Sequence, residues 1–249
     1  MKYLFFFFLI VQTVSSQIKL NPEDTEVWHP EPKVVTPGKS SAPPSDAIIL
    51  FDGTDFLKWQ HGNTKKPVQW TLNKDKSMTV KPGKGGIETI EEHGSIQFHI
   101  EWKTPTLIKG KGQGRGNSGI FFQRRYEVQV LDSYNNRTYS NGQASSIYKQ
   151  HIPLVNSTRK PGERQVYDII FNEPKSNAEG QKIKSGSFTI LLNGVLVQNN
   201  VEILGTTEYI GVPKNGRDDM PGDRGSDYES PEYSRRPLTL QDHGDLVSY

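Results

Sequence analysis

Apolar and polar residues alternate along most of this chain from Ile48 onward, which is the pattern of β-strands with one buried face. The segment 95–103 alternates cleanly, with an amide, an imidazole, a carboxylate and an ammonium group between its apolar positions. The runs 119–132 and 238–243 follow the same rule, and the apolar run 166–171 is typical of a further strand. We therefore predict strands over these segments.

A hairpin is predicted where Asn193-Gly194 separates the apolar runs 188–192 and 195–198. Asn and Gly both adopt the positive φ angles that a tight hairpin turn requires. The 23 Gly and 16 Pro residues indicate many turns, and no window of 12 residues in the body shows a helical repeat. The pattern predicts an all-β fold, a two-sheet antiparallel jelly-roll sandwich.

The polar faces of three predicted strands carry hydrogen-bonding side chains in register. They are Gln97, His99 and Glu101 on one strand, Gln123, Arg125, Glu127 and Gln129 on the second, and Gln241 and His243 on the third. If these strands are neighbours in one sheet, the sheet has a polar face suited to a sugar, whose hydroxyls need such partners. The alternative is an ordinary solvated face, on which Glu127 pairs with Arg125 or a neighbouring lysine.

The N-terminus has the layout of an export signal. Lys2 precedes the apolar run 4–11, and small residues follow, so residues 1–16 are predicted to be a signal peptide. The run is shorter than the roughly 20 residues of a membrane span. A Pro-rich leader follows over 17–45, and the polar stretch 211–236 is predicted to be a long loop inside the domain. We expect a periplasmic or secreted protein without a membrane span.

Composition excludes several classes of chemistry. Lys and Arg total 30 against 28 Asp and Glu, and this near balance disfavours a nucleic-acid binder. The absence of cysteine excludes disulfides, a cysteine nucleophile and zinc–thiolate sites. The chain also has no dinucleotide-binding glycine motif.

Short motifs along the body are familiar as a set. In chain order they include Leu50-Phe51-Asp52-Gly53-Thr54, Glu101-Trp102-Lys103-Thr104-Pro105, Arg115-Gly116-Asn117-Ser118-Gly119, Tyr126-Glu127-Val128-Gln129-Val130-Leu131-Asp132, Ile147-Tyr148-Lys149-Gln150 and Leu240-Gln241-Asp242-His243-Gly244. Together they resemble the 3-keto-disaccharide hydrolase domain family over residues 46–249. The resemblance implies a concanavalin A-like jelly roll and glycan-processing activity in an exported protein.

The chain departs from this family's pattern in two places. Arg164 stands where the family usually has Trp, which would alter an aromatic contact. The family's final strand also continues past the position of Tyr249, so we expect the C-terminal strand of this chain to be truncated.

The chemistry that the resemblance implies needs a base. A ketone at C3 of a sugar acidifies the hydrogen on C2, so a base can remove that proton and the group on C1 can leave, and hydration then completes a net hydrolysis. His243 is the base that we favour, because the unperturbed pKa of an imidazole lies near neutrality. Glu127 and Glu101 are alternatives, or partners that orient the imidazole.

We expect the substrate to be bound by a larger polar set from the same motifs. Its members are Gln129, Arg115, Asn117, Arg125, Asp132, Tyr148 and Gln241. Arg115, Arg125 or a bound divalent metal ion would stabilise the enolate, and Gln129 and Asn117 would hold hydroxyls. No tight metal-ligand spacing is present, so a cofactor stays undecided. A separate oxidoreductase would have to supply the 3-keto sugar.

Two other functions fit the same residues. A conventional glycosidase would use Glu101 and Glu127 as its two carboxylates. A non-catalytic carbohydrate-binding module would use the polar sheet face alone, because fold does not determine function.

Overall fold

The computed structural model describes residues 20–40, 42–177, 182–207, 209–210 and 235–249. The chain divides into two units, with the boundary between Ile48 and Ile49. The predicted signal peptide lies outside the described residues, and so does the predicted loop 211–236 up to residue 234. In the first unit the described residues include one short 3-10 turn, η1 (Pro22–Thr25). Within the described ranges, no helix is long and apolar enough to cross a bilayer.

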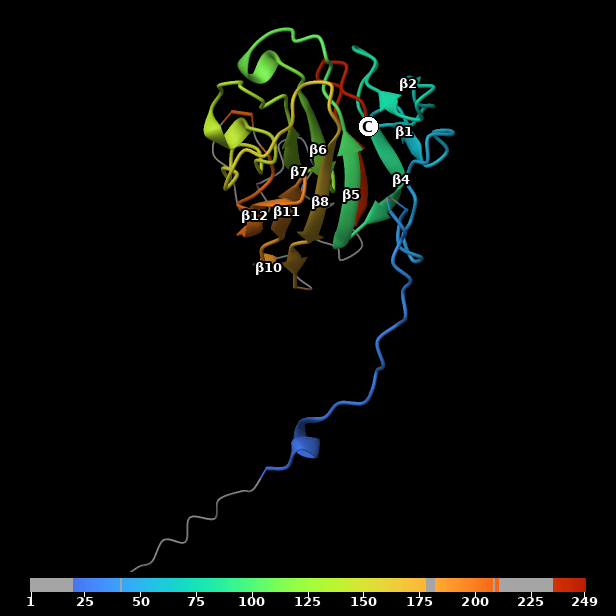
Figure 1. The fold of residues 1–249 in the computed structure, drawn as a ribbon, viewed down its shortest axis with the longest axis vertical. Coiled ribbons are helices and arrows are strands. Elements are labelled where there is room, and N and C mark those ends of the chain that lie inside the picture. Colours follow the sequence, from blue (N-terminus) through green and yellow to red (C-terminus); the bar gives the residue numbers. More distant parts are fainter. Residues whose placement is uncertain (1–19, 41, 178–181, 208, 211–234) are drawn as a thin grey trace, which may run out of the picture. The chain divides into compact units, whose positions relative to one another are not determined.

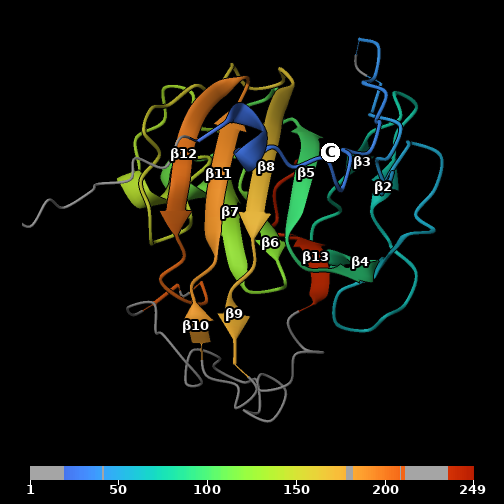
Figure 2. The same ribbon diagram turned by 90° about the horizontal axis from the view of Figure 1, so that it is seen from below.

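The second unit is a sandwich of two antiparallel sheets (Figure 1), and Figure 2 shows one sheet in front of the other. The first sheet has the order β1-β4-β13-β6-β7, with bounds Trp59–His61, Ile87–His93, Arg236–Leu240, Ser118–Phe122 and Tyr126–Val130. The second sheet has the order β12-β11-β8-β5, with bounds Val195–Glu202, Ser187–Leu192, Gln165–Asn172 and Ile96–Trp102. The prediction of an all-β antiparallel sandwich is confirmed.

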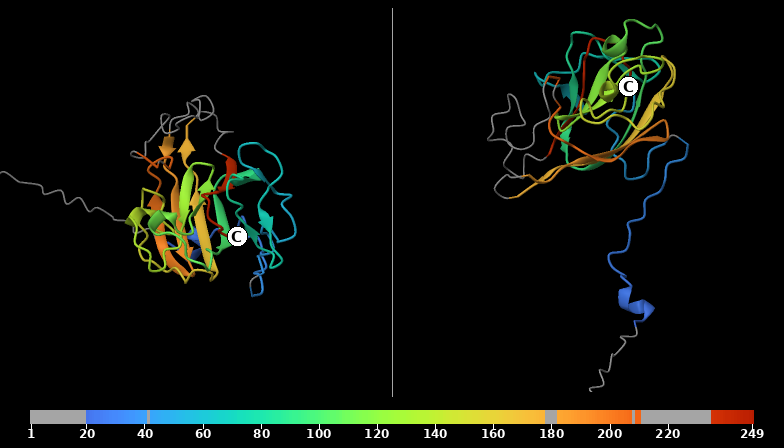
Figure 3. Two further views of the ribbon diagram at one scale, coloured as in Figure 1. Left: turned by 90° about the horizontal axis from the view of Figure 1, so that it is seen from above. Right: turned by 90° about the vertical axis from the view of Figure 1, so that its left-hand side faces the viewer.

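The remaining elements are short. Two ribbons pair β2 with β3 and β9 with β10, and η2 and η3 are single turns; their bounds are Thr71–Leu72, Met78–Thr79, Lys175–Ser176, Lys182–Lys184, Gly112–Gly114 and Ser140–Gly142. The loops around η2 and η3 lie side by side (Figure 3), because Asn136 accepts a hydrogen bond from the Gly112 amide at 2.8 Å and Gln113 donates one to the Gly142 carbonyl at 2.8 Å.

The three predicted polar strand faces do not lie in one sheet. The strand over 95–103 is β5, an edge of the second sheet, whereas β7 and β13 belong to the first. The expectation of a single shared face is therefore wrong for Gln97, His99 and Glu101. Alternation shows which residues of one strand share a face, but it carries no information about which strands pair.

The run 119–132 is a hairpin rather than one strand. β6 and β7 pair antiparallel, and the turn between them places Gln123 at φ 53° and Arg124 at φ 58°. Neither residue is a turn signal, because side chains of their size rarely adopt positive φ. The hairpin at Asn193-Gly194 has the same conformation, with φ 55° and 81°, and its prediction is confirmed.

The strand predicted over 238–243 is β13, which ends at Leu240. Gln241 still extends the sheet, because its amide donates to the Gly119 carbonyl at 3.0 Å, but His243 lies in the following loop. At the C-terminus, Tyr249 is buried, stacks on Trp70 and exchanges backbone hydrogen bonds with Met78.

Aromatic rings from both sheets fill the centre of the sandwich. Phe122 of β6 lies 5.1 Å from Phe171 of β8 and 5.1 Å from Phe188 of β11, measured between ring centroids. Phe171 and Phe188 are 5.0 Å apart. The two contacts of Phe122 join the two sheets, and aromatic packing of this kind adds to the stability gained by burial.

Neighbouring residues on β8 provide a test of the sandwich. Phe171 is 1% exposed and Ile170 is 42% exposed, because they point to opposite faces. We expect Phe171→Ala to lower the free energy of unfolding by about 3–5 kcal/mol through the cavity it leaves. Ile170→Ala should change it by about 0.5 kcal/mol or less. Denaturant unfolding of both variants measures the difference, and equal effects would contradict this placement of β8.

Candidate active site

One row of side chains crosses the outer face of the first sheet. Its Cα partners follow the register Gln60↔Glu88, Glu88↔Thr239, Thr239↔Phe121 and Phe121↔Glu127. The residues next to them in sequence, such as Ile87 on β4 and Val128 on β7, point into the core. The row therefore lies on the face of the sheet that turns away from the second sheet.

Beyond β7 the row continues into the segment 145–148. Val128 forms a β-bridge with Ile147, and the Tyr148 amide donates to the Glu127 carbonyl at 3.0 Å. In this antiparallel register Tyr148 lies directly across from Glu127, so their side chains share a face. The edge of the sheet at β7 is thus covered by the chain itself.

Glu127 is the unusual residue of this row. It is 5% exposed, and within the described part of the chain its carboxyl group makes no hydrogen bond or ion pair. Burial raises the pKa of Glu127 to about 8, since a carboxylate loses its hydration there without gaining a partner. A carboxyl group with such a pKa exchanges a proton near neutral pH.

Gly119 provides the space that Glu127 occupies. A Cβ atom at position 119 would lie 2.5 Å from Oε1 of Glu127 and 2.8 Å from the Phe121 ring. Any side chain at this position would therefore displace the carboxyl group, so glycine is needed here for close approach rather than for a special backbone angle.

A second row on the same face carries amides. Gly119 pairs with Gln129 on one side and receives the Gln241 amide hydrogen bond on the other. Nε2 of Gln129 donates to Oδ1 of Asn117 at 3.0 Å and to Oε1 of Gln113 at 3.2 Å. The Oε1 atoms of Gln129 and Gln241 are both buried and have no partner in the described residues. They are hydrogen-bond acceptors on either side of Gly119, without a partner in the part of the chain that the structure describes.

A pair of tyrosines adjoins Glu127. The hydroxyls of Tyr139 and Tyr148 are 2.5 Å apart, and Nζ of Lys149 lies 4.8 Å from the centroid of the Tyr139 ring. Burial raises the pKa of both phenols, and the Glu127 charge raises each further. Sequence reasoning named Tyr148 but missed Tyr139, which lies outside the familiar motifs.

Arg115 and Asp132, both predicted to bind substrate, form an ion pair with each other, and their role toward a substrate stays a prediction. Nε of Arg115 lies 2.7 Å from Oδ2 of Asp132, and its Nη2 donates to the Tyr134 carbonyl at 2.9 Å. Both side chains are buried. Removing either partner of such a buried pair would leave an uncompensated buried charge, which is strongly destabilising.

Arg125 is buried at the start of β7, where its carbonyl accepts the Thr207 amide at 2.9 Å. The amide of Glu127, two residues further along, donates to the Thr207 hydroxyl at 2.9 Å. The predicted role of Arg125 toward a substrate stays a prediction.

Glu101 does not join this site. It lies on β5 in the other sheet, points away from the core, and accepts two hydrogen bonds from Arg164 at 2.7 and 2.8 Å. The expectation that Glu101 partners Glu127 is therefore wrong, because the core separates their two outward faces. Arg164 stands where the family usually has Trp, and its guanidinium group forms an exposed ion pair with Glu101.

His243 lies in the loop after β13. Its side chain is exposed and makes no interaction in the described residues. The loop itself is anchored near the site, because Asp245 accepts the Asn117 amide at 2.8 Å and Asp242 accepts the Gly85 amide at 2.9 Å. The role predicted for His243 stays a prediction.

A charge cluster on the same face was missed by sequence reasoning. Glu88 of β4 is buried and accepts hydrogen bonds from Arg124 at 2.7 and 2.8 Å, as well as from Lys65. Burial alone would raise the pKa of Glu88, but the bonds and charges of Arg124 and Lys65 outweigh it and hold the pKa below its usual value. In the sequence Ile-Glu-Thr-Ile, nothing distinguishes this glutamate from a solvated one.

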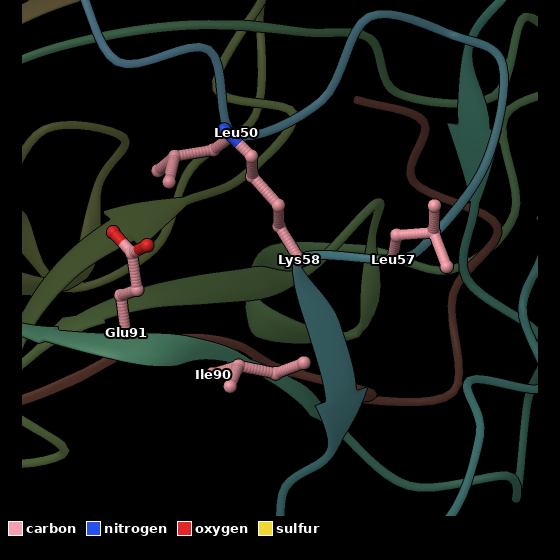
Figure 4. Close-up of a pocket in the computed structure, with 5 residues that line it drawn as sticks. All are labelled: Leu50, Leu57, Lys58, Ile90 and Glu91. Carbon is pink, nitrogen blue, oxygen red and sulfur yellow. The ribbon is translucent and has the colours of Figure 1, made fainter.

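None of the His, Asp and Glu side chains of the described residues form a group of three that could hold a metal ion. A small pocket lies at the β1–β4 end of the first sheet (Figure 4), lined by Leu50, Leu57, Lys58, Ile90 and Glu91. Its lining is mostly aliphatic, and the sheet order places it at the opposite end from Glu127.

Residues 46–249 match the family described as the 3-keto-alpha-glucoside-1,2-lyase-like domain. The chain belongs to this family. The resemblance of the motifs to the 3-keto-disaccharide hydrolase domain family is thereby confirmed.

Two solved structures from Parabacteroides distasonis resemble this chain, and each carries the name "putative glycosyl hydrolase". One is 43% identical, with a TM-score of 0.81, and the alignment covers 93% of this chain and 94% of that one. The other is 18% identical, with a TM-score of 0.52 and coverage of 81% and 89%, and shows the fold alone. No curated protein sequence matches the chain.

The buried carboxyl group predicts a stability effect with a defined pH dependence. The unfolded pKa is near 4.5 and the folded pKa is about 8. Between these values the unfolded chain ionises first, so the native state of this family member loses stability as pH rises. We expect Glu127→Gln to match the parent protein near pH 4 and to exceed its stability by a few kcal/mol above pH 8, since one pKa unit corresponds to about 1.4 kcal/mol.

Thermal and denaturant unfolding at several pH values measure this difference. Glu101→Gln is the matched control, because its partly exposed pair with Arg164 should contribute about 1 kcal/mol or less. A Glu127→Gln variant that is less stable than the parent at high pH would contradict the desolvated environment.

Proposed function

We propose that this protein is a glycan-processing enzyme that cleaves the glycosidic bond of 3-keto-glycosides, with Glu127 as the base that removes the proton from C2. Family membership supports the reaction class, and the name carried by the structure that is 43% identical supports a glycan substrate. The observation that carries the assignment is the buried, unpaired Glu127 carboxyl group on the polar face of the first sheet.

The ketone explains why a carboxylate can do this work. The electrons of the broken C2–H bond spread onto the C3 oxygen as an enolate, so the C2 hydrogen is far more acidic than in the parent sugar. A desolvated carboxylate is also a stronger base than one in water. Expulsion of the group on C1 gives an unsaturated ketone, and addition of water across its double bond completes a net hydrolysis.

The amide row would position the sugar ring. The free Oε1 acceptors of Gln129 and Gln241 lie on either side of Gly119, so hydroxyls of one sugar can be held while Glu127 reaches C2. Asn117 and Gln113 orient the Gln129 amide through their own hydrogen bonds. Positioning of this kind contributes to catalysis by holding the reacting atoms in place.

The biological setting follows from the substrate. A 3-keto sugar must be supplied by an oxidoreductase, and this chain carries no dinucleotide-binding motif of its own. The predicted N-terminal signal supports a location in the periplasm or outside the cell. Protease-protection of the intact protein in cells of its source would test that location.

Glu127→Gln should lower kcat/KM on a 3-keto-disaccharide by about 10²–10⁴-fold, which is the usual contribution of a general base. The base must be ionised, so kcat/KM of the parent enzyme should rise with pH and level off above a pKa of about 8. The pH profile of kcat/KM measures both. Glu101→Gln, the control on the other sheet, should change the rate only slightly.

His243→Ala belongs in the same series. A large loss in this variant, together with full activity of Glu127→Gln, would assign the base to His243 instead.

The ketone itself is tested by comparing substrates. The enzyme should cleave a 3-keto-disaccharide and leave the parent disaccharide intact, and it should exchange the C2 hydrogen for deuterium in heavy water. Mass spectrometry of the products follows both. Equal cleavage of the two sugars would favour a conventional glycosidase, and binding without turnover of either would favour a carbohydrate-binding module.

The two-carboxylate mechanism has less support in the geometry. Carboxyl groups in such enzymes lie about 5–10 Å apart across the bond they cleave. Glu101 and Glu127 are on outward faces of sheets whose backbones alone are about 10 Å apart. No second carboxyl group of the described residues is hydrogen-bonded to Glu127.

A further inference from the structure

Removal of a C2 proton by Glu127 leaves half of the reaction without a catalyst. The oxygen on C1 departs from a sugar as an alkoxide, which is a poor leaving group unless it is protonated as the bond breaks. Glu127 cannot supply that proton, because in this step it is the acceptor. A second group must therefore hold a proton on the same face.

The Tyr139–Tyr148 pair lies beside Glu127, where such a proton donor is needed. Tyr148 is the cross-strand neighbour of Glu127, since its amide donates to the Glu127 carbonyl and Ile147 bridges Val128. The Tyr148 hydroxyl is joined to that of Tyr139 at 2.5 Å. Tyr148 is 8% exposed and Tyr139 is 37% exposed, so the pair leads from the buried face toward solvent.

Lys149 adds a positive charge beside both rings. Its Nζ lies 4.8 Å from the Tyr139 centroid and 5.9 Å from the Tyr148 centroid. The backbone of Lys149 is held at φ 62°, and its amide donates to the Asn141 carbonyl at 2.8 Å. A non-glycine residue at positive φ costs conformational energy, so the surrounding structure holds this lysine in place. Its ammonium group favours a transient phenolate nearby.

We propose that Tyr148 is the acid that protonates the leaving glycosidic oxygen, and that Tyr139 relays the proton of the incoming water back to it. This rests on the proposed function. In the elimination, the C2 proton passes to Glu127, the C2–H electrons form the C1–C2 double bond, and the C1–O bond breaks with its electrons on oxygen. That oxygen takes the Tyr148 proton. In the hydration, water gives its hydroxide to C1 and its proton to Tyr148, and Glu127 returns its proton to C2.

The two groups can hold the required protonation states together. The carboxylate is present above a pH of about 8, and burial and the Glu127 charge raise the pKa of Tyr148 above its usual value. Tyr148 therefore keeps its proton in the range where Glu127 has lost its own. Free glutamic acid and tyrosine would satisfy this condition as well, but only the fold places Tyr148 across from Glu127, beside the bridge between Ile147 and Val128.

The leaving group provides the test. Tyr148→Phe should lower kcat/KM on a 3-keto-disaccharide by about 100-fold or more, which is the usual effect of losing a general acid. On a 4-nitrophenyl 3-keto-glucoside the same variant should stay close to the parent enzyme, because nitrophenolate leaves without a proton. An equal loss on both substrates, or no loss on the disaccharide, would overturn the proposal.

Two controls separate the outcomes. Tyr134→Phe removes a hydroxyl that makes no hydrogen bond in the described residues and should leave both rates unchanged. Thermal unfolding of Tyr148→Phe excludes a folding defect. If the parent enzyme cleaves neither 3-keto substrate, the proposed function itself fails and takes this inference with it. If the parent cleaves both and Tyr148→Phe does too, the inference about the acid alone fails.

Discussion

The burial of one carboxyl group without a partner is the constraint around which this fold is arranged. Glu127 is 5% exposed, and its desolvation raises the pKa of the group to about 8. Three features hold the Glu127 carboxyl group in this buried position despite the loss of its hydration. They are the β6–β7 hairpin, the absence of a side chain at Gly119 and the segment at Tyr148 that covers the edge of β7. A buried carboxyl group without a partner lowers the stability of the fold. Such destabilising features are common in active sites, where activity is often gained at the expense of stability.

Two other clusters of charged groups near this face differ from Glu127, because each charged group in them is paired with a group of opposite charge. Arg115 and Asp132 are buried against each other, and Glu88 is held by Arg124 and Lys65. In both clusters each charge has a partner, so burial is compensated and the groups serve to hold loops and strands together. Glu127 alone among these carboxylates has none in the described residues. The raised pKa of Glu127 therefore follows from the absence of a partner rather than from residue type.

Much of the fold could be predicted because its signals are local. Alternation in 95–103 reports a strand with one buried face, and Asn193-Gly194 reports a turn whose φ angles only such residues adopt easily. The β6–β7 turn could not be predicted, because Gln123 and Arg124 rarely adopt positive φ by themselves. They adopt it here because the pairing of β6 with β7 requires a tight turn between the two strands. Glu101 illustrates the same limit for the site, because its motif places it on a strand but cannot say in which sheet.

The sequence by itself determined the all-β class, the family and the residue types on the polar strand faces, because each depends on short runs of neighbouring residues. Only the tertiary structure decided which of those residues meet. It brought Glu127 together with Tyr148 and Tyr139, set Glu101 apart with Arg164, and used Asp132 to neutralise Arg115. These outcomes depend on strand pairing and on burial, and both are set by contacts between residues far apart in the chain.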